Sequence, residues 1–415
     1  MMLSGNRALD VTTHSGWPGG RILADLGVDV IKVEPPGGDP GRSLGPFYKG
    51  EVNPERSLSW FAYNLGKRGI TLNLEVAEGR EIFKRLVKDI DFILESFPPG
   101  RMKELGLDYN ELREINPKII FTSISPFGQS GPYRDYKAPD IVTMAMGGFS
   151  YVTGDADRPP LRISFPMACA MACAQAVVGS LIAFHHRQNT GVGQYVDVSA
   201  QESVVNTLIS ALPYWELSRI LTTRVGPLFF RGGLKGEQAH QRVIWTCQDG
   251  AITFMPLGGM VGSRANRALV KWMEEEGMAN DFLRSIDWDT FSTPTLTREF
   301  NRQFEEVVGG FFKTHTRKEL HEGAQQRGIF LQFVATPEDV VGSEQLAARD
   351  FWVDVPHPEL DEVIRYPGIF AKASESPLRL GSRAPLIGEH NIDIYQDELG
   401  LSPEELEDLK RKGII

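Results

Sequence analysis

The sequence predicts an α/β protein with two domains, the larger of which contains a doubly wound parallel sheet. Residues 7–34 have the pattern of a strand, a short helix and a second strand, which is the unit that builds parallel sheets. Further short apolar segments alternate with helical segments along the first half of the chain. The 415 residues also exceed the roughly 250–300 residues at which a single hydrophobic core stops growing. We therefore expect a Rossmann-like large domain and a smaller second domain.

The first strand–helix–strand unit, in residues 7–34, begins an alternation of strands and helices. Residues 8–12 form an apolar strand that ends in the polar turn THSGW, residues 18–26 form a helix that stops at Gly27, and residues 28–33 form the second strand. No G-x-G-x-x-G follows the first strand, so the sequence lacks the fingerprint of a dinucleotide-binding protein.

The later elements of the first half continue the alternation. The further strands expected are residues 67–74, 91–95, 119–124 and 195–199, and the helices are residues 76–87, 109–115, 167–188 and 200–212. The helix over 167–188 is rich in alanine, glycine and serine, and such small side chains let another backbone approach closely. We expect this helix to be buried in the centre of the molecule.

The pattern changes after about residue 214. Short strands are expected at 243–247 and 251–255, and acidic helices at 268–276 and 278–285. We interpret residues 214–305 as the small α+β domain, inserted into a large domain formed by residues 1–213 and 306–415.

Composition and charge exclude several classes of protein. The formal net charge of −10 is unlike the basic faces of nucleic-acid-binding proteins and of proteins that bind anionic membranes. The N-terminus has no apolar signal-peptide segment, and the three cysteines form neither a C-x-x-C pair nor a group with histidines. We therefore expect a cytoplasmic protein with reduced cysteines, no metal, no nucleic-acid partner and no membrane partner.

Five stretches of sequence resemble the class III CoA-transferases, the family of the carnitine and formyl-CoA transferases. They are DLGVDVIKVEPPGGDPGR, FGQSGPY, TGVGQYVDV after Arg187, APLIGEHN and LGLSPEELEDLKRKGII. The resemblance covers almost the whole chain. It implies a Rossmann-like large domain with an inserted small domain, and an interlocked dimer in which each chain is threaded through the other.

The resemblance also implies the chemistry, and one residue departs from it. The family attacks an acyl-CoA thioester with an aspartate at the start of the helix that carries Gly179, and CoA is then held on that carboxyl group. Counting back from Gly179 to this position gives Cys169, and no Asp or Glu occurs between Asp157 and Asp197. A thiol has no carbonyl group on which CoA could be held. We therefore expect no catalytic residue in this chain, with Cys169 as a residue lining the helix.

The family also suggests which residues would contact the CoA substrate. Ser96 and Pro98 replace the family's Asn and Arg, and Glu104 replaces a basic residue, so binding of CoA by this chain stays open. No covalently bound cofactor is expected. The candidate contacts for coenzyme A or an acyl-CoA are His14, Ser15, Lys67, Leu72, Ser96, Phe97, Arg101 and Lys137.

Other acid or base candidates are weaker. Asp155 and Asp157 stand in a Gly- and Pro-rich loop typical of a solvated turn. Asp140 follows Pro139, where the related racemases would carry a histidine, so racemase chemistry is disfavoured.

These observations favour the non-catalytic subunit of a heteromeric CoA-transferase. Its partner would be a homologue that retains the aspartate. The family resemblance suggests that CoA moves between succinyl-CoA and an aromatic or other carboxylic acid, with (R)-benzylsuccinate as a candidate. One alternative is a homodimeric acyl-CoA enzyme of altered chemistry, an isomerase or lyase, that uses His14 or Asp140. Another is an acyl-CoA-binding protein without catalysis.

Overall fold

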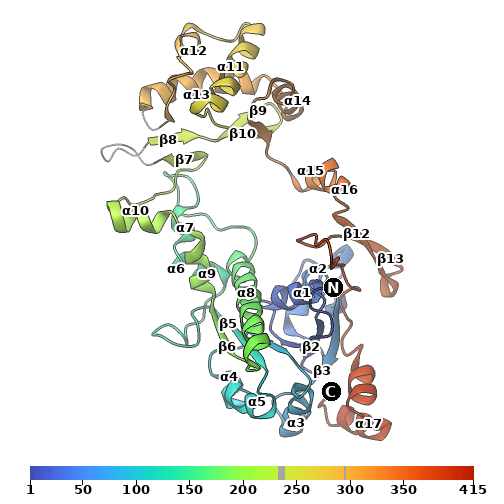
Figure 1. Ribbon diagram of the computed structural model, residues 1–415. Coiled ribbons are helices and arrows are strands. Elements are labelled where there is room, and N and C mark those ends of the chain that lie inside the picture. The colour runs from blue at the N-terminus through green and yellow to red at the C-terminus, as the bar shows by residue number, and fades with distance from the viewer. Residues whose placement is uncertain (232–238, 294–295) are drawn as a thin grey trace. The chain divides into compact units, whose positions relative to one another are not determined.

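The computed structural model describes residues 1–231, 239–293 and 296–415 (Figure 1). The chain divides into two compact units. Unit 1 contains Met1–Phe149, Ile163–Leu208 and Glu344–Ile415, and unit 2 contains Ser150–Arg162 and Ile209–Ser343.

Unit 1 is built on a six-stranded sheet in which every pair of neighbouring strands is parallel. The strand order is β3-β2-β1-β4-β5-β6, the order of a Rossmann-type doubly wound sheet. This confirms the predicted α/β class. The strands are β1 (Arg7–Val11), β2 (Asp29–Glu34), β3 (Lys67–Thr71), β4 (Phe92–Glu95), β5 (Ile120–Ser125) and β6 (Tyr195–Ser199).

Helices cover both faces of this sheet. On one face α1 (Trp17–Asp25) and α8 (Met167–Thr190) pack against the apolar side chains of β1, β2, β4 and β5. On the other face α3 (Ala77–Val87), α5 (Tyr109–Ile115) and α17 (Pro403–Arg411) bury their apolar side chains against the same strands. Each fully buried side chain of Leu or Phe size contributes about 1.5–3 kcal/mol, so the two faces supply most of the stability of unit 1.

The long helix α8 is only partly buried. Ala172, Cys173 and Ala176 pack on the ends of β5 and β6, as their small size allows. Val178 and Ile182, on another face of the helix, are 50% and 66% exposed. The expectation that the whole helix is buried is therefore wrong for the single chain.

By length and composition, α8 is also the one helix among the described residues that could cross a membrane. Its most apolar window has a mean hydropathy of 1.9 and is 39% buried. Because the small residues of this helix pack on the sheet of unit 1, we interpret it as a sheet-covering helix.

The C-terminal segment returns to the N-terminal half of unit 1, where both ends of the chain lie (Figure 1). It contains α16 (Glu344–Ala348), the antiparallel pair β12 (Trp352–His357) and β13 (Glu362–Pro367), η6 (Pro358–Leu360), the π-helix η7 (Ile392–Glu398) and α17. The Tyr395 hydroxyl donates to the Thr71 carbonyl at 2.7 Å. The buried Arg42 guanidinium pairs with Glu34, donates to the Pro385 carbonyl and lies 3.6 Å from the centre of the Trp60 ring.

The remaining elements of unit 1 are short. They are η1 (Pro40–Ser43), η2 (Tyr48–Gly50), η3 (Pro54–Arg56), α2 (Leu58–Tyr63), α4 (Arg101–Glu104), α6 (Asp140–Met146) and α9 (Ala200–Thr207), with α7 (Phe149–Val152) at the boundary with unit 2.

Unit 2 has its own hydrophobic core. Its antiparallel sheet has the order β11-β10-β9, and a separate pair is formed by β7 and β8. The strands are β7 (Leu228–Arg231), β8 (Ala239–Arg242), β9 (Ile244–Cys247), β10 (Gly250–Phe254) and β11 (Leu331–Phe333). The helices are α10 (Ala211–Ser218), α11 (Gly259–Glu275), α12 (Asp281–Ser285), α13 (Arg298–Lys313), α14 (Arg317–Arg327) and α15 (Pro337–Val341).

The second boundary of this unit differs from the expected one. The expected limit at residue 305 falls inside α13. Phe304, Val308 and Phe312 of that helix share one core with β9 and β10, so the helix cannot be divided between two domains. Unit 2 therefore continues to Ser343.

Candidate functional site

The strand order of unit 1 indicates where a ligand site should lie. In an open parallel sheet, ligands bind at the carboxyl ends of the strands where the order reverses, here between β1 and β4. A cavity of about 580 Å³ occupies this place. The turns after the two strands contribute His14, Ser15, Ser96 and Phe97 to its lining, and all its lining residues belong to unit 1.

The cavity brings together five of the eight predicted CoA contacts, together with the position of the missing aspartate. The lining includes His14, Ser15, Ser96, Phe97 and Lys137, and also Asp140 and Cys169. Lys67, Leu72 and Arg101 do not line it. Whether the five residues contact CoA stays a prediction.

Lys67 is fully buried beneath the turn that follows β1. Its ammonium group donates to Asp10 Oδ2 at 2.7 Å, to the Asn64 side-chain oxygen at 2.8 Å and to the Trp17 carbonyl at 2.9 Å. Asp10 Oδ1 in turn accepts from the Thr12 N–H at 3.0 Å. Burial lowers the pKa of Lys67 to about 8, and the Asp10 carboxylate opposes this shift. Lys67 and Asp10 thus fix both ends of the turn that carries His14 and Ser15. The ammonium group of Lys67 is occupied by these bonds, so the structure does not support the predicted contact between Lys67 and a CoA phosphate.

A second set of hydrogen bonds joins this turn to the turn after β4. The Thr13 N–H donates to Ser96 Oγ at 2.8 Å, and the Thr13 hydroxyl lies 3.1 Å from the same oxygen. Ser96, which replaces the family's Asn, therefore connects the two turns that form the floor of the cavity.

The other two predicted contacts lie elsewhere. Leu72 is 2% exposed and packs in the core beneath α3. The Arg101 guanidinium pairs with Glu75 and with Glu104, the latter at 2.9 Å. Glu104, which replaces a basic residue of the family, thus neutralises the charge of Arg101 and does not line the cavity.

Cys169 lies in the first turn of α8, opposite Asp140 at the start of α6. The Cys169 N–H donates to Asp140 Oδ1 at 3.1 Å. The N-cap residue Pro166 offers no side-chain hydrogen bond, so Asp140 satisfies one of the free N–H groups at the start of α8. Burial, with the neighbouring Asp140 carboxylate, raises the pKa of the Cys169 thiol to about 12. The thiol is therefore protonated near neutral pH and is a poor nucleophile.

Glu95, the last residue of β4, is a buried carboxyl group directly before the cavity wall. One of its oxygens accepts from the Phe97 N–H at 2.7 Å, and the side chain is also bonded to Ser123. Burial raises the pKa of Glu95 to about 7, with a smaller contribution from the Asp197 charge. The sequence analysis missed this residue, although a carboxylate inside the apolar run FILE was the pattern that could have shown it.

No group of three or more His, Cys, Asp or Glu side chains that could hold a metal ion occurs among the residues that the structure describes. The acidic lining residues Asp135 and Asp140 have other partners, Arg134 and the Cys169 N–H.

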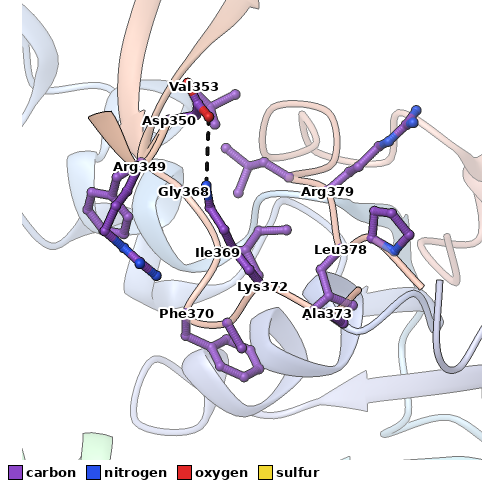
Figure 2. A pocket seen from close by; sticks show the side chains of 14 residues that line it. Arg349, Asp350, Val353, Gly368, Ile369, Phe370, Lys372, Ala373, Leu378 and Arg379 are labelled. Atoms are coloured by element: carbon purple, nitrogen blue, oxygen red, sulfur yellow. Dashed lines mark ion pairs between the residues drawn. The ribbon is translucent and has the colours of Figure 1, made fainter. Parts of the chain in front are cut away.

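A second cavity of about 560 Å³ lies in the C-terminal segment of unit 1 (Figure 2). Apolar side chains such as Phe351, Phe370 and Leu378 line it, and the Lys372 ammonium reaches across to Asp350 at 3.7 Å. The Arg349 and Arg379 side chains point away from each other in Figure 2, so they do not converge on a common ligand atom. None of the predicted site residues lines this cavity.

Comparisons with known proteins find relatives that match nearly the full length of the chain. The chain is 34% identical, over 410 residues, to the succinyl-CoA:(R)-benzylsuccinate CoA-transferase subunit BbsE of Thauera aromatica, covering 99% of this chain and 97% of that protein. It is 32% identical to the succinyl-CoA–D-citramalate CoA-transferase of Chloroflexus aurantiacus, covering 95% and 93% of the two chains.

A solved structure shows the same fold over nearly the full length. A CaiB/BaiF family protein from Brucella suis superposes with a TM-score of 0.80 at 27% identity, covering 95% of this chain and 98% of that one. Residues 3–391 match the sequence profile described as CoA-transferase family III. The chain therefore belongs to CoA-transferase family III.

Proposed function

We propose that this chain is the subunit without a nucleophilic aspartate in a heteromeric CoA-transferase. The observation that carries the proposal is the identity and state of residue 169. A half-buried, protonated thiol stands at the start of α8, in a cavity that several residues expected at a CoA site also line. A family fold that lacks the nucleophile is what a supporting subunit would look like.

The chemistry of CoA transfer explains why the thiol is not a substitute. A carboxylate attacks the thioester carbonyl, and a mixed anhydride forms as CoA thiolate leaves. The thiolate then attacks the carbonyl of the enzyme side chain, so that the donor acid leaves and CoA is held as an enzyme thioester. The second attack needs a carbonyl carbon on the enzyme, which Cys169 does not have. The partner subunit would supply this group.

The similarity to named subunits supports a heteromeric assembly. The relatives include BbsE and the alpha and beta subunits of a succinyl-CoA–L-malate CoA-transferase of Chloroflexus aurantiacus. We propose succinyl-CoA as the donor and an aromatic or other carboxylic acid as the acceptor, with (R)-benzylsuccinate as the first acceptor to test. The place of action we propose is the cytoplasm.

A second candidate function rests on Asp140. This carboxylate lines the cavity and lies against the start of α8, so a homodimer could use it, with His14, as an acid or base on an acyl-CoA. A purely acyl-CoA-binding protein would use the same cavity without turnover.

Co-expression with an aspartate-bearing homologue separates these functions. The chain, the homologue and the complex are purified, and each is assayed for succinyl-CoA-dependent transfer to (R)-benzylsuccinate and to other acids. The matched control is a complex whose homologue carries Asn in place of its aspartate.

We expect a stable complex that is active only with the partner's aspartate intact. Turnover of an acyl-CoA by this chain alone would contradict the proposal and favour the altered enzyme. Binding of acyl-CoA with no turnover in any assembly would favour the binding protein.

A further inference from the structure

A buried carboxyl group, that of Glu95, lies next to the wall of the cavity in unit 1. The residue is 3% exposed, and one of its carboxyl oxygens accepts from the Phe97 N–H at 2.7 Å. Phe97 and its neighbour Ser96 line the cavity, whereas Glu95 does not. The hydrogen bond between Glu95 and Phe97 therefore joins a group outside the cavity to the turn that forms part of the cavity wall.

Two hydroxyl groups lead from Glu95 toward the surface. The Ser123 hydroxyl donates to the Glu95 carboxylate, and the Tyr195 hydroxyl donates to Ser123 Oγ at 3.1 Å. Ser123 is buried, whereas Tyr195 is 39% exposed. Burial raises the pKa of Tyr195 to about 12, so its hydroxyl keeps its proton near neutral pH. Both donors favour the ionised form of Glu95, because each hydrogen bond strengthens the next one along the chain.

The charged groups that face these side chains are carboxylates. Asp197 of β6 opposes ionisation of Glu95, and Asp108 at the start of α5 acts on Tyr195. The neighbour of Glu95 on β1 is the apolar Val11, and within the described residues no Lys, Arg or His forms an ion pair with Glu95. A buried carboxylate without a cation is costly, so Glu95 keeps its proton to a higher pH than an exposed glutamate does.

We propose that the hydrogen bond between Glu95 and the Phe97 N–H is a pH-dependent contact that controls the mobility of the cavity wall. An ionised carboxylate accepts a charge-assisted hydrogen bond, which is roughly twice as strong as a bond between neutral groups. Protonation of Glu95 weakens this bond, so the turn with Ser96 and Phe97 becomes more mobile. The wall is held more firmly above neutral pH than below it. The inference goes beyond the proposed function, because it requires neither a partner subunit nor CoA transfer.

The test follows the Phe97 amide by nuclear magnetic resonance. The full-length chain carries isotope-labelled phenylalanine, and the Phe97 signal is identified by its loss in Phe97→Leu. We expect the chemical shift of this amide proton to titrate with a midpoint close to the Glu95 pKa of about 7, moving downfield as the hydrogen bond strengthens with rising pH. Glu95→Gln cannot ionise, so the Phe97 signal of that variant should not titrate.

Three further variants test the groups around Glu95. Tyr195→Phe removes the outer donor, so the midpoint should rise by about half a pH unit or more. Asp197→Asn removes the repelling charge but keeps an acceptor for the Gln129 N–H, so the midpoint should fall. Tyr109→Phe is the matched control, because the Tyr109 ring centre lies 5.9 Å from that of Tyr195 but its hydroxyl donates to the Gly193 carbonyl. Its midpoint should match that of the wild type.

Hydrogen exchange of the same amide measures the mobility of the wall. Exchange rates are first corrected for the dependence of the intrinsic exchange rate on pH. In the wild type the protection of the Phe97 N–H should then be about threefold or more higher at pH 8 than at pH 6, because only the ionised carboxylate holds it with a charge-assisted bond. In Glu95→Gln the protection should be the same at both pH values.

The inference is overturned if the wild-type Phe97 signal does not move between pH 6 and pH 8, or if it titrates equally in Glu95→Gln. Equal protection of the wild-type amide at the two pH values would also overturn it. A midpoint that moves in the same direction in Tyr195→Phe and Asp197→Asn would exclude Glu95 as the titrating group. The measurements use this chain alone, so a failure of the heteromeric proposal would not change their outcome.

Discussion

Position 169 carries Cys where the family resemblance implies an aspartate, and the proposed function depends on this one side chain. Its thiol is kept protonated by burial and by the Asp140 carboxylate, and the cavity around it persists. The family assignment and the position of the cavity were predictable from sequence motifs. The further rise in the pKa of the thiol was not, because it depends on burial and on a contact with Asp140 that joins two helices distant in sequence.

The first prediction concerns Cys169→Asp. The substitution places a carboxylate where the family carries its nucleophile, so we expect the variant to gain acyl-CoA-dependent transfer at least about tenfold above the wild-type background. Capture of an enzyme-bound CoA thioester by mass spectrometry would locate the adduct on residue 169. The asparagine of Cys169→Asn has nearly the same shape as the aspartate but is not a nucleophile, so this variant should remain inactive. Equal activity of the two variants would contradict the assignment of this position.

The second prediction uses the buried carboxyl group of Glu95. Its pKa in the folded chain is about 7, above the value of 4.5 for a free glutamate. Below pH 4.5 the carboxyl group is protonated in both the folded and the unfolded chain, so its ionisation does not change the free energy of unfolding. As the pH rises from 4.5 to 7 the unfolded chain ionises first, so the folded state loses stability, in total on the order of 3 kcal/mol once the pH exceeds 7.

Glu95→Gln keeps an acceptor for the Phe97 N–H but cannot ionise. Its melting temperature relative to the wild type should therefore rise between pH 5 and pH 8, as measured by thermal unfolding at both values. Glu114→Gln, at an exposed glutamate of α5, should show no such change between the two pH values. A constant difference between Glu95→Gln and the wild type would show that Glu95 does not titrate in this range.

At the scale of elements, the turn after β1 depends on the buried Lys67–Asp10 pair. Lys67→Met removes the ammonium and leaves the Asp10 carboxylate buried, with the Lys32 ammonium 3.8 Å away as its nearest remaining charge. We expect unfolding to become easier by about 3–5 kcal/mol. The turn carrying His14 should also loosen, so any affinity for CoA should fall.

Denaturant unfolding and CoA titration of the Lys67→Met variant check this prediction. Lys84→Met is the control, since the pair of Lys84 with Glu81 is exposed and such pairs contribute about 0–1 kcal/mol. Similar losses in both variants would mean that Lys67 is no more important to the fold than a surface charge.

The strands of unit 1 were predictable because each is a short apolar run bounded by polar turns or glycines. Other features were not. The sequence shows that α8 is apolar, but it does not show how much of the helix surface other elements cover. Val178 and Ile182 of this helix are exposed. The end of unit 2 was misplaced because α13 carries core residues on both sides of the expected boundary at 305. The pairing of Asp10 with Lys67 and the raised pKa of Glu95 were not predicted, because both depend on tertiary contacts.

For the whole molecule, the family resemblance implies subunits that are threaded through one another, and this leads to a prediction about assembly. Separately purified chains could exchange partners only by extensive unfolding. Co-expression of this chain with the aspartate-bearing homologue should give active complex, whereas mixing the two purified chains at 25 °C for some hours should give little.

Size-exclusion chromatography with a tag on one chain measures the fraction of mixed complex. Unfolding of the mixture in denaturant, followed by refolding, is the control and should restore complex formation. Rapid formation of mixed complex from the native chains would exclude an interlocked arrangement.

The discontinuity of unit 1 has a consequence for synthesis of the chain. All six strands have been made by Ser199, but the core beneath α3 and α5 also contains Ile394, Tyr395, Leu406 and Leu409. During synthesis on the ribosome, the apolar face of α3 and α5 therefore stays incompletely covered until unit 2 and the C-terminal segment have been translated. That interval exposes the nascent chain to aggregation and chaperone capture. During the same interval a partner chain could associate with this chain before α17 packs on the sheet.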